Sequence, residues 1–195
     1  MLILPHYQSV IALSAGLLLS GAVYAETQHH QYSAHQHGVV ELNIAVDKQQ
    51  LVFELLVPGS DAVGFEHAPS TAPEKQQLER ALATLNQPEL LFGINPAAQC
   101  EIQDVQVKAD FDNEQEHAEP AHHEETAEHH EDEAEEHGEL TAVYHYRCAS
   151  IEKLQFVDNH WFKHFTNSQK IEVQVLRSGV QQAWSLNKEH TKILL

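Results

Sequence analysis

The chain contains little cysteine, methionine or basic charge, and each shortage excludes some chemistry. Cys100 and Cys148 are the only cysteines and Met1 is the only methionine. The wide cysteine spacing argues against a zinc site of the Cys-x2-Cys kind, and the lack of methionine removes the thioether ligands that copper(I) favours. Only 11 Lys and Arg accompany 29 Asp and Glu, a net charge of −18. A nucleic-acid partner is therefore not expected, because an anionic surface repels phosphate.

Motifs of common enzyme classes are also missing. The sequence has no serine nucleophile motif, no phosphate-binding loop and no dinucleotide-binding glycine pattern. A hydrolytic metal site needs a few fixed ligands and an open coordination position in a preorganised pocket, and no motif indicates one. We therefore expect a protein that is not an enzyme.

The N-terminal segment is apolar and predicts export. An apolar run from Val10 to Leu19 precedes the small-residue end Val23-Tyr24-Ala25, a pattern typical of a cleaved signal peptide. The run is short for a membrane span, and no cysteine near the cleavage point indicates a lipid anchor. We expect a signal peptide at 1–25, cleaved after Ala25, and a periplasmic protein with no stable membrane insertion. Residues 26–195 are then a single β-rich metal-binding domain.

Alternation of apolar and polar residues predicts several β-strands. An antiparallel hairpin is predicted first, and further alternating segments follow it. The predicted strands are 39–46, 51–57, a short one from Cys100, 140–148, 170–176, 180–186 and 193–195. Leucines at helical spacing predict one helix at 74–87, between Pro73 and Pro88. The expected fold class is mainly β: an antiparallel sandwich or barrel-like domain with one short helix and a disordered His/Glu-rich insertion.

Both cysteines lie in predicted strands. Ile102, in the strand that Cys100 opens, is out of phase with Val105 and Val107, which indicates a β-bulge. Cys148 falls on the apolar face of its strand. Two cysteines in an oxidising compartment most simply form one disulfide. We expect a Cys100–Cys148 bond that joins the base of the segment between the two strands.

That segment, residues 112–139, carries much of the charge. It contains 13 of the 29 acidic residues and no Lys or Arg, so the rest of the mature chain has 16 acidic and 11 basic residues. Its heptad 122–128 is followed by a similar one at 129–135. With few apolar groups to bury, it cannot recover an ordering entropy of about 1–2 kcal/mol per residue, so we expect disorder without a ligand.

Histidines in the same segment predict binding of zinc or a similar divalent metal, because imidazole and carboxylate are both zinc ligands. The candidate ligands are His117, His122, His123, His129, His130 and His137. None of these histidines is three or four residues from another, so a helix would bind through mixed pairs such as Glu119 with His123, whereas a folded-back loop would gather several histidines. We expect several exchangeable sites that weaken below about pH 6.5, as protons compete for imidazole.

Two alternatives to zinc capture remain open at this point. Such a site binds copper(II) more tightly than zinc, and nickel(II) also suits it, so a copper or nickel tolerance protein has the same signature. A non-catalytic interaction module, in which the acidic segment is a partner surface, is the other alternative.

A second group of histidines lies before the first predicted strand. His35 and His37 are two residues apart and, with His29 and His30, form a candidate metal-binding cluster near the mature N-terminus. His67 lies in an irregular stretch, and we interpret it as part of a turn.

The order of these features resembles a known family. The features that carry the resemblance follow one another along the chain. They are a signal peptide, His35-x-His37-Gly38 before a strand, Gly64-Phe65-Glu66-His67-Ala68-Pro69, a His- and Glu-rich insert between two cysteines, and Tyr144-x-Tyr146-x-Cys148. The chain in this respect resembles the ZrgA-like periplasmic zinc-uptake proteins. The resemblance implies zinc-regulated expression and a role in supplying Zn²⁺ to an import system, with a periplasmic component of the importer as partner.

Overall fold

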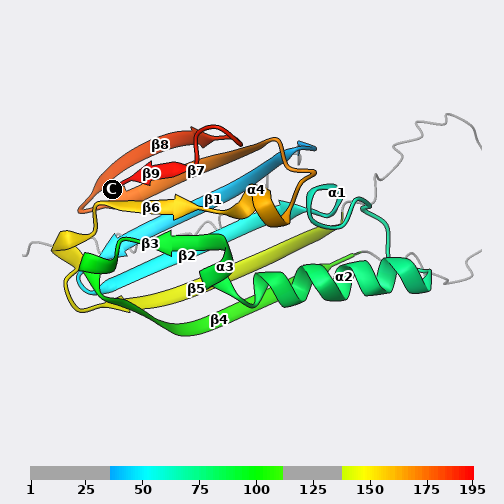
Figure 1. The fold of residues 1–195 in the computed structure, drawn as a ribbon, viewed down its shortest axis with the longest axis horizontal. Coiled ribbons are helices and arrows are strands. Elements are labelled where there is room, and N and C mark those ends of the chain that lie inside the picture. The colour runs from blue at the N-terminus through cyan, green and yellow to red at the C-terminus, as the bar shows by residue number, and fades with distance from the viewer. Residues whose placement is uncertain (1–35, 112–137) are drawn as a thin grey trace, which may run out of the picture. The chain divides into compact units, whose positions relative to one another are not determined.

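Two β-sheets form the framework of the residues that the computed structural model describes, which are 36–111 and 138–195 (Figure 1). The larger sheet has the strand order β4-β5-β2-β1-β7-β8 and the smaller has β3-β6-β9. The larger consists of β1 (Val39–Asp47), β2 (Gln50–Pro58), β4 (Cys100–Asp110), β5 (Glu139–Cys148), β7 (Lys170–Arg177) and β8 (Val180–Leu186). The smaller consists of β3 (Phe92–Ile94), β6 (Phe156–Asn159) and β9 (Lys192–Leu194). The mainly β class predicted from the sequence is confirmed, and the predicted choice between a sandwich and a barrel-like domain is resolved as two separate sheets.

Neighbouring strands are antiparallel except β1 and β7, which pair in parallel. The predicted β1–β2 hairpin is confirmed, with Asp47 opposite Gln50. Strands β3 and β6 and the parallel pairing were not predicted. These strands and this pairing depend on contacts between segments that are far apart in the sequence. The periodicity of a single segment does not indicate which distant segment it contacts.

The predicted helix is α2 (Ala72–Leu85), and it begins two residues earlier than expected. Thr71 caps it through a capping box with Glu74, and Pro73 fits inside the first turn because an N–H there has no helical partner. The structure adds short helices that the sequence did not predict. They are α1 (Gly59–Ala62), α3 (Pro88–Leu91) and α4 (Trp161–His164), with the 3-10 turns η1 (Pro96–Ala98) and η2 (Ile151–Lys153).

The core lies between the larger sheet and the elements that cover one of its faces. In Figure 1 the smaller sheet lies in front of the larger one, and the Phe53 ring of β2 packs 5.0 Å from the Phe92 ring of β3. The buried Tyr144 hydroxyl of β5 donates to the Leu85 carbonyl at 2.7 Å, which attaches the end of α2 to the sheet. The opposite face is more open, with Glu41 and Ala45 of β1 exposed on it.

The predicted disulfide is confirmed, but its predicted location is wrong. Cys100 and Cys148 are bonded, with sulfurs 1.97 Å apart, and are register partners at one end of the β4–β5 hairpin. Asp110 and Glu139 are partners at the other end, from which residues 112–137 depart. The bond therefore lies about 30 Å from the base of the insertion, at roughly 3.4 Å per strand residue. The predicted bulge is present, where the register shifts between Ile102 and Asp104.

Candidate functional site

The insertion leaves the described fold at what we call the insertion root, formed by Asp110, Phe111, Gly138 and Glu139. The backbone N–H of Gly59 donates to the Gly138 carbonyl at 2.6 Å. A Cβ on Gly138 would overlap the Phe111 ring, so a glycine permits this close packing. The two ends of the insertion are thus held together by the end of β2 and the start of α1.

A loop after α1 packs against the insertion root. The Phe65 ring lies 5.9 Å from the Phe111 ring and 5.1 Å from the His67 ring. The backbone oxygen of Glu66 also lies against Gly138. These contacts bring Glu66 and His67, which are both possible metal ligands, to the base of the insertion.

His37 forms the first imidazole–carboxylate pair beside this loop. Its Nε2 is 3.0 Å from Glu66 Oε1, and its side chain is 68% exposed whereas that of Glu66 is 16% exposed. The next residue, Gly38, has φ of 82° and donates its N–H to the buried Asp61 Oδ2 at 2.8 Å. A buried carboxylate therefore positions the backbone that carries His37.

His67 forms a second such pair with Glu74, at 3.5 Å between Nε2 and Oε1. The other oxygen of Glu74 accepts from the N–H groups of Thr71 and Ser70, each at 2.9 Å. These backbone hydrogen bonds, Thr71 first, lower the pKa of Glu74 to about 2. Glu74 therefore presents a carboxylate to His67 over the whole ordinary pH range.

The two pairs have the chemistry of zinc ligation but are each incomplete as a site. A carboxylate on one imidazole nitrogen orients the ring, and the second nitrogen is then available to bind a metal. Within residues 36–111 and 138–195, no three His, Cys, Asp or Glu side chains are grouped closely enough to hold an ion. The segments that pack around the insertion root thus provide oriented donors in two separate pairs.

Of the predicted metal ligands, His37 alone falls in the described part of the chain. His35, His117, His122, His123, His129, His130 and His137 lie outside it. Their roles, and the predicted disorder of the insertion, therefore remain predictions. His67 lies in a loop as interpreted from the sequence, and the structure adds its carboxylate partner.

Asp61, Glu66 and Glu74 were not predicted from the sequence as residues of the site. Asp61 and Glu66 contact residues that are distant in the chain, and Glu74 belongs to a helix cap. Carboxylates are also common in this sequence, so a single one does not stand out. The one feature of the sequence that could have indicated Glu66 as a site residue is its position next to His67 in a short motif.

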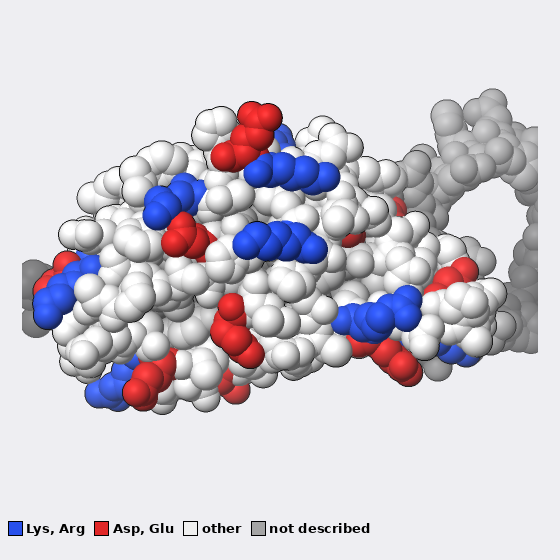
Figure 2. Space-filling view, in the orientation of Figure 1, with Lys and Arg blue, Asp and Glu red and all other residues white. Residues whose placement is uncertain are grey.

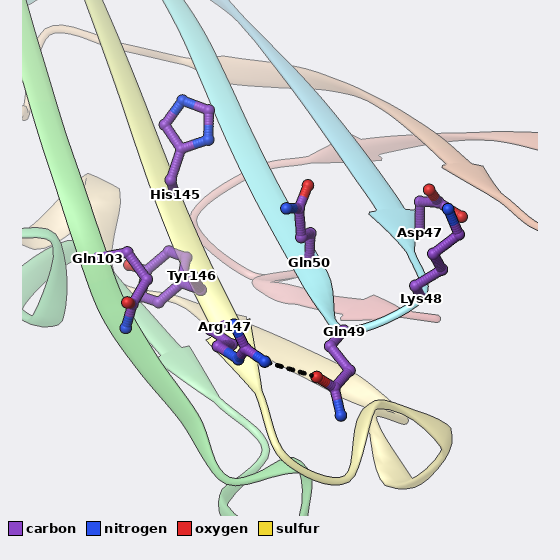
Figure 3. Close-up of a pocket in the computed structure, with 8 residues that line it drawn as sticks. All are labelled: Asp47, Lys48, Gln49, Gln50, Gln103, His145, Tyr146 and Arg147. Atoms are coloured by element: carbon purple, nitrogen blue, oxygen red, sulfur yellow. Dashed lines mark hydrogen bonds between the residues drawn. The ribbon is translucent and has the colours of Figure 1, made fainter.

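A pocket on the exposed face of the larger sheet has different chemistry (Figure 3). It lies at the β1–β2 turn, and Arg147 donates to Gln49 at 3.1 Å within it. His145 shares the pocket with Arg147, Lys48 and Asp47. The two cationic side chains outnumber the one carboxylate and oppose the binding of a metal cation. We therefore do not place a metal centre there.

A family model described as "ZrgA family zinc uptake protein" matches residues 34–195. The match includes His35, His37, both cysteines and the whole insertion. A search of curated proteins found no match. No helix among the described residues is long and apolar enough to cross a bilayer.

Proposed function

The chain belongs to the ZrgA family of zinc uptake proteins, and from this premise we propose that it captures Zn²⁺ in the periplasm and holds it for an import system. The role is one of binding and buffering rather than catalysis. Zn²⁺ is the cargo, and the importer component that receives it is the partner.

The observation that carries this proposal is the position of the two imidazole–carboxylate pairs. His37 with Glu66 and His67 with Glu74 lie in the segments that pack around the insertion root. In the proposed mechanism the histidines of residues 112–137 collect ions, and the oriented donors at the root retain one near the fold. Ligand exchange among equivalent imidazoles then permits release to an acceptor.

A periplasmic location is supported by two independent features. The Cys100–Cys148 disulfide belongs to an oxidising compartment. Residues 1–25 have the pattern of a signal peptide. The proposed role agrees with this location, because a protein that captures zinc for an importer must meet the ion before the importer does.

Calorimetric titration of residues 26–195 with Zn²⁺, Cu²⁺ and Ni²⁺, repeated after deletion of residues 114–137, tests the proposal. We expect the intact protein to bind several zinc ions and the deletion variant to lose most of these sites while keeping its fold. Unchanged stoichiometry and affinity after the deletion would refute capture by the insertion. Poor growth of a strain lacking the protein under zinc chelation, restored by added zinc but not by copper or nickel, would support zinc as the cargo.

The donors at the root are tested in the same deletion background. Glu66→Gln should lower the remaining zinc affinity by about 10- to 100-fold, since it removes the carboxylate that orients a ligand imidazole. Glu79→Gln is a matched control, because it removes the same charge from an exposed residue of α2 that belongs to neither imidazole–carboxylate pair. Equal effects of the two changes would exclude a specific role of the His37–Glu66 pair.

A further inference from the structure

Residues Gln36 to Val39 form a tight turn that carries His37. The Val39 N–H donates to the Gln36 carbonyl at 3.0 Å, which closes the turn. Gly38 has φ of 82°, and His37 has no positive φ. A glycine of positive φ in third place is typical of a type II β-turn. His37 therefore occupies the second place, and the peptide between His37 and Gly38 is the central peptide of the turn.

Asp61 binds the N–H group of this central peptide. The Gly38 N–H donates to Asp61 Oδ2 at 2.8 Å in a buried contact. On the other side, the Gly38 carbonyl accepts from the N–H groups of Gln169 and Lys170, each at 2.9 Å. Turns of types I and II differ in the orientation of the central peptide. An acceptor fixed at Asp61 therefore selects the orientation of the peptide that follows His37.

The surroundings of Asp61 indicate a role beyond stability of the fold. Its side chain is 2% exposed, and no ion pair joins it to a Lys, Arg or His of the described residues. Its Oδ1 is buried without a hydrogen-bond partner in the same part of the chain. A buried carboxylate without a cation lowers stability, whereas an asparagine could accept the same hydrogen bond without a charge. Such an unfavourable group is more typical of a functional position than of a purely structural one.

We propose that Asp61 is a positioning residue for zinc at the insertion root and that it acts through His37. By holding the peptide after His37, it fixes the direction in which the imidazole leaves the backbone, where Nε2 lies 3.0 Å from Glu66 Oε1. The ring is then already oriented when the ion arrives, so binding loses less conformational entropy. This inference rests on the proposed function, because it assigns to His37 a part in holding Zn²⁺.

The short helix α1 joins this turn to the insertion root. Asp61 lies within α1, and the first residue of α1, Gly59, donates its N–H to the Gly138 carbonyl at 2.6 Å. A single helical turn therefore contacts both the peptide after His37 and the root. Loss of the Asp61 carboxylate should release the His37 turn from α1 while the contact between Gly59 and Gly138 remains.

Zinc affinity of residues 26–195, measured by competition with a zinc indicator, tests the proposal. Asp61→Ala should weaken the tightest zinc site about tenfold, as expected for loss of a residue that orients a ligand. Asp61→Asn should restore most of the affinity, because its amide oxygen can accept from the Gly38 N–H. Ser168→Ala is the matched control, since Ser168 is buried and accepts from Trp161 Nε1 at 3.0 Å. It removes a buried hydrogen bond elsewhere and should leave the zinc affinity unchanged.

A double-mutant cycle separates positioning of His37 from a general effect on the fold. If Asp61 acts through His37, Asp61→Ala should have no further effect on zinc affinity in a protein that already carries His37→Ala. A loss of the same size with and without His37 would overturn the proposal, because the carboxylate would then act by another route.

Gly38→Ala keeps the proposal testable if Asp61→Ala does not fold. It leaves Asp61 in place but strains the turn, because φ of 82° is unfavourable for alanine and the new Cβ would lie 3.2 Å from the Gln169 side chain. It should also weaken zinc binding, and again only while His37 is present. Unchanged zinc affinity in the folded variants would overturn this inference alone. Absence of zinc binding by the unchanged protein would overturn the proposed function and this inference together.

Discussion

Glu74 shows how one side chain joins local structure to the candidate site. One of its oxygens closes the capping box of α2, and the other lies 3.5 Å from His67 Nε2. The sequence contains the Thr71-x-x-Glu74 pattern of a capping box, yet the prolines around it led to a predicted start at residue 74. The same local hydrogen bonds that begin the helix also keep the carboxylate charged beside the imidazole.

The titration of Glu74 predicts a pH dependence of stability. Its pKa is lowered from 4.5 to about 2 in the folded protein, chiefly by the backbone N–H of Thr71. The stabilisation is therefore fully present above pH 4.5 and is lost as the pH falls through 2. We expect Glu74→Gln to be less stable than the unchanged protein at pH 7 and equally stable near pH 2, as measured by denaturant unfolding.

Glu79→Gln is the control for this prediction. Glu79 is an exposed residue of the same helix that takes no part in the cap, so its substitution should change stability little at either pH. A deficit of Glu74→Gln that is the same at pH 7 and pH 2 would show that the charge of Glu74 is not the cause.

At the scale of elements, the β4–β5 hairpin separates the disulfide from the insertion root, although the disulfide was predicted to lie at the base of the insertion. Its far end holds the Cys100–Cys148 disulfide, and its near end holds the insertion root. Burial of Cys148 and the register of the long strands make the disulfide part of the fold. The insertion is instead held by the close packing of Gly138 against Phe111 and by the Gly59 hydrogen bond.

This separation predicts that stability and zinc capture depend differently on the disulfide. The double change Cys100→Ser with Cys148→Ser should reduce the free energy of unfolding by about 2–4 kcal/mol, because the bond closes a long loop of the unfolded chain. Zinc stoichiometry, measured by titration at a temperature where the variant is folded, should not change. Loss of zinc binding in the folded variant would mean that the disulfide does position the insertion.

On the scale of the whole molecule, charge is divided between an acidic insertion and a nearly balanced fold. Figure 2 shows Lys and Arg interspersed with Asp and Glu on one face of the described residues, without a patch of a single sign. Outside residues 112–139 the mature chain has 16 acidic and 11 basic residues. The attraction of a divalent cation is therefore concentrated at the insertion, where the histidines also lie.

The proposed mode of capture predicts a steep dependence of zinc affinity on pH. Metal binds neutral imidazole, and imidazole protonates near pH 6.5. For an ion held by two histidines, the affinity should fall about 100-fold between pH 7.5 and 5.5, since each imidazole contributes about tenfold. Competition titration with a zinc indicator measures this change, with circular dichroism to verify folding. A pH-independent affinity over this range would point to carboxylate ligands instead.

The sequence by itself determined those features that depend on neighbouring residues. Alternation with period two identified β1, β2, β5 and β7 and the buried side of each, because successive side chains of a strand point to opposite faces. It also identified β8, without its buried side. Composition identified the charged, histidine-rich segment, and the order of short motifs indicated the zinc uptake family.

Only the tertiary structure decided which distant segments meet. The parallel pairing of β1 with β7, the contact of His37 with Glu66 and the position of the disulfide relative to the insertion root all join residues well separated in the chain. A local pattern is the same whichever partner a strand or side chain acquires. Those partners are selected by burial of one shared core and by the register of the sheet, which are properties of the whole fold.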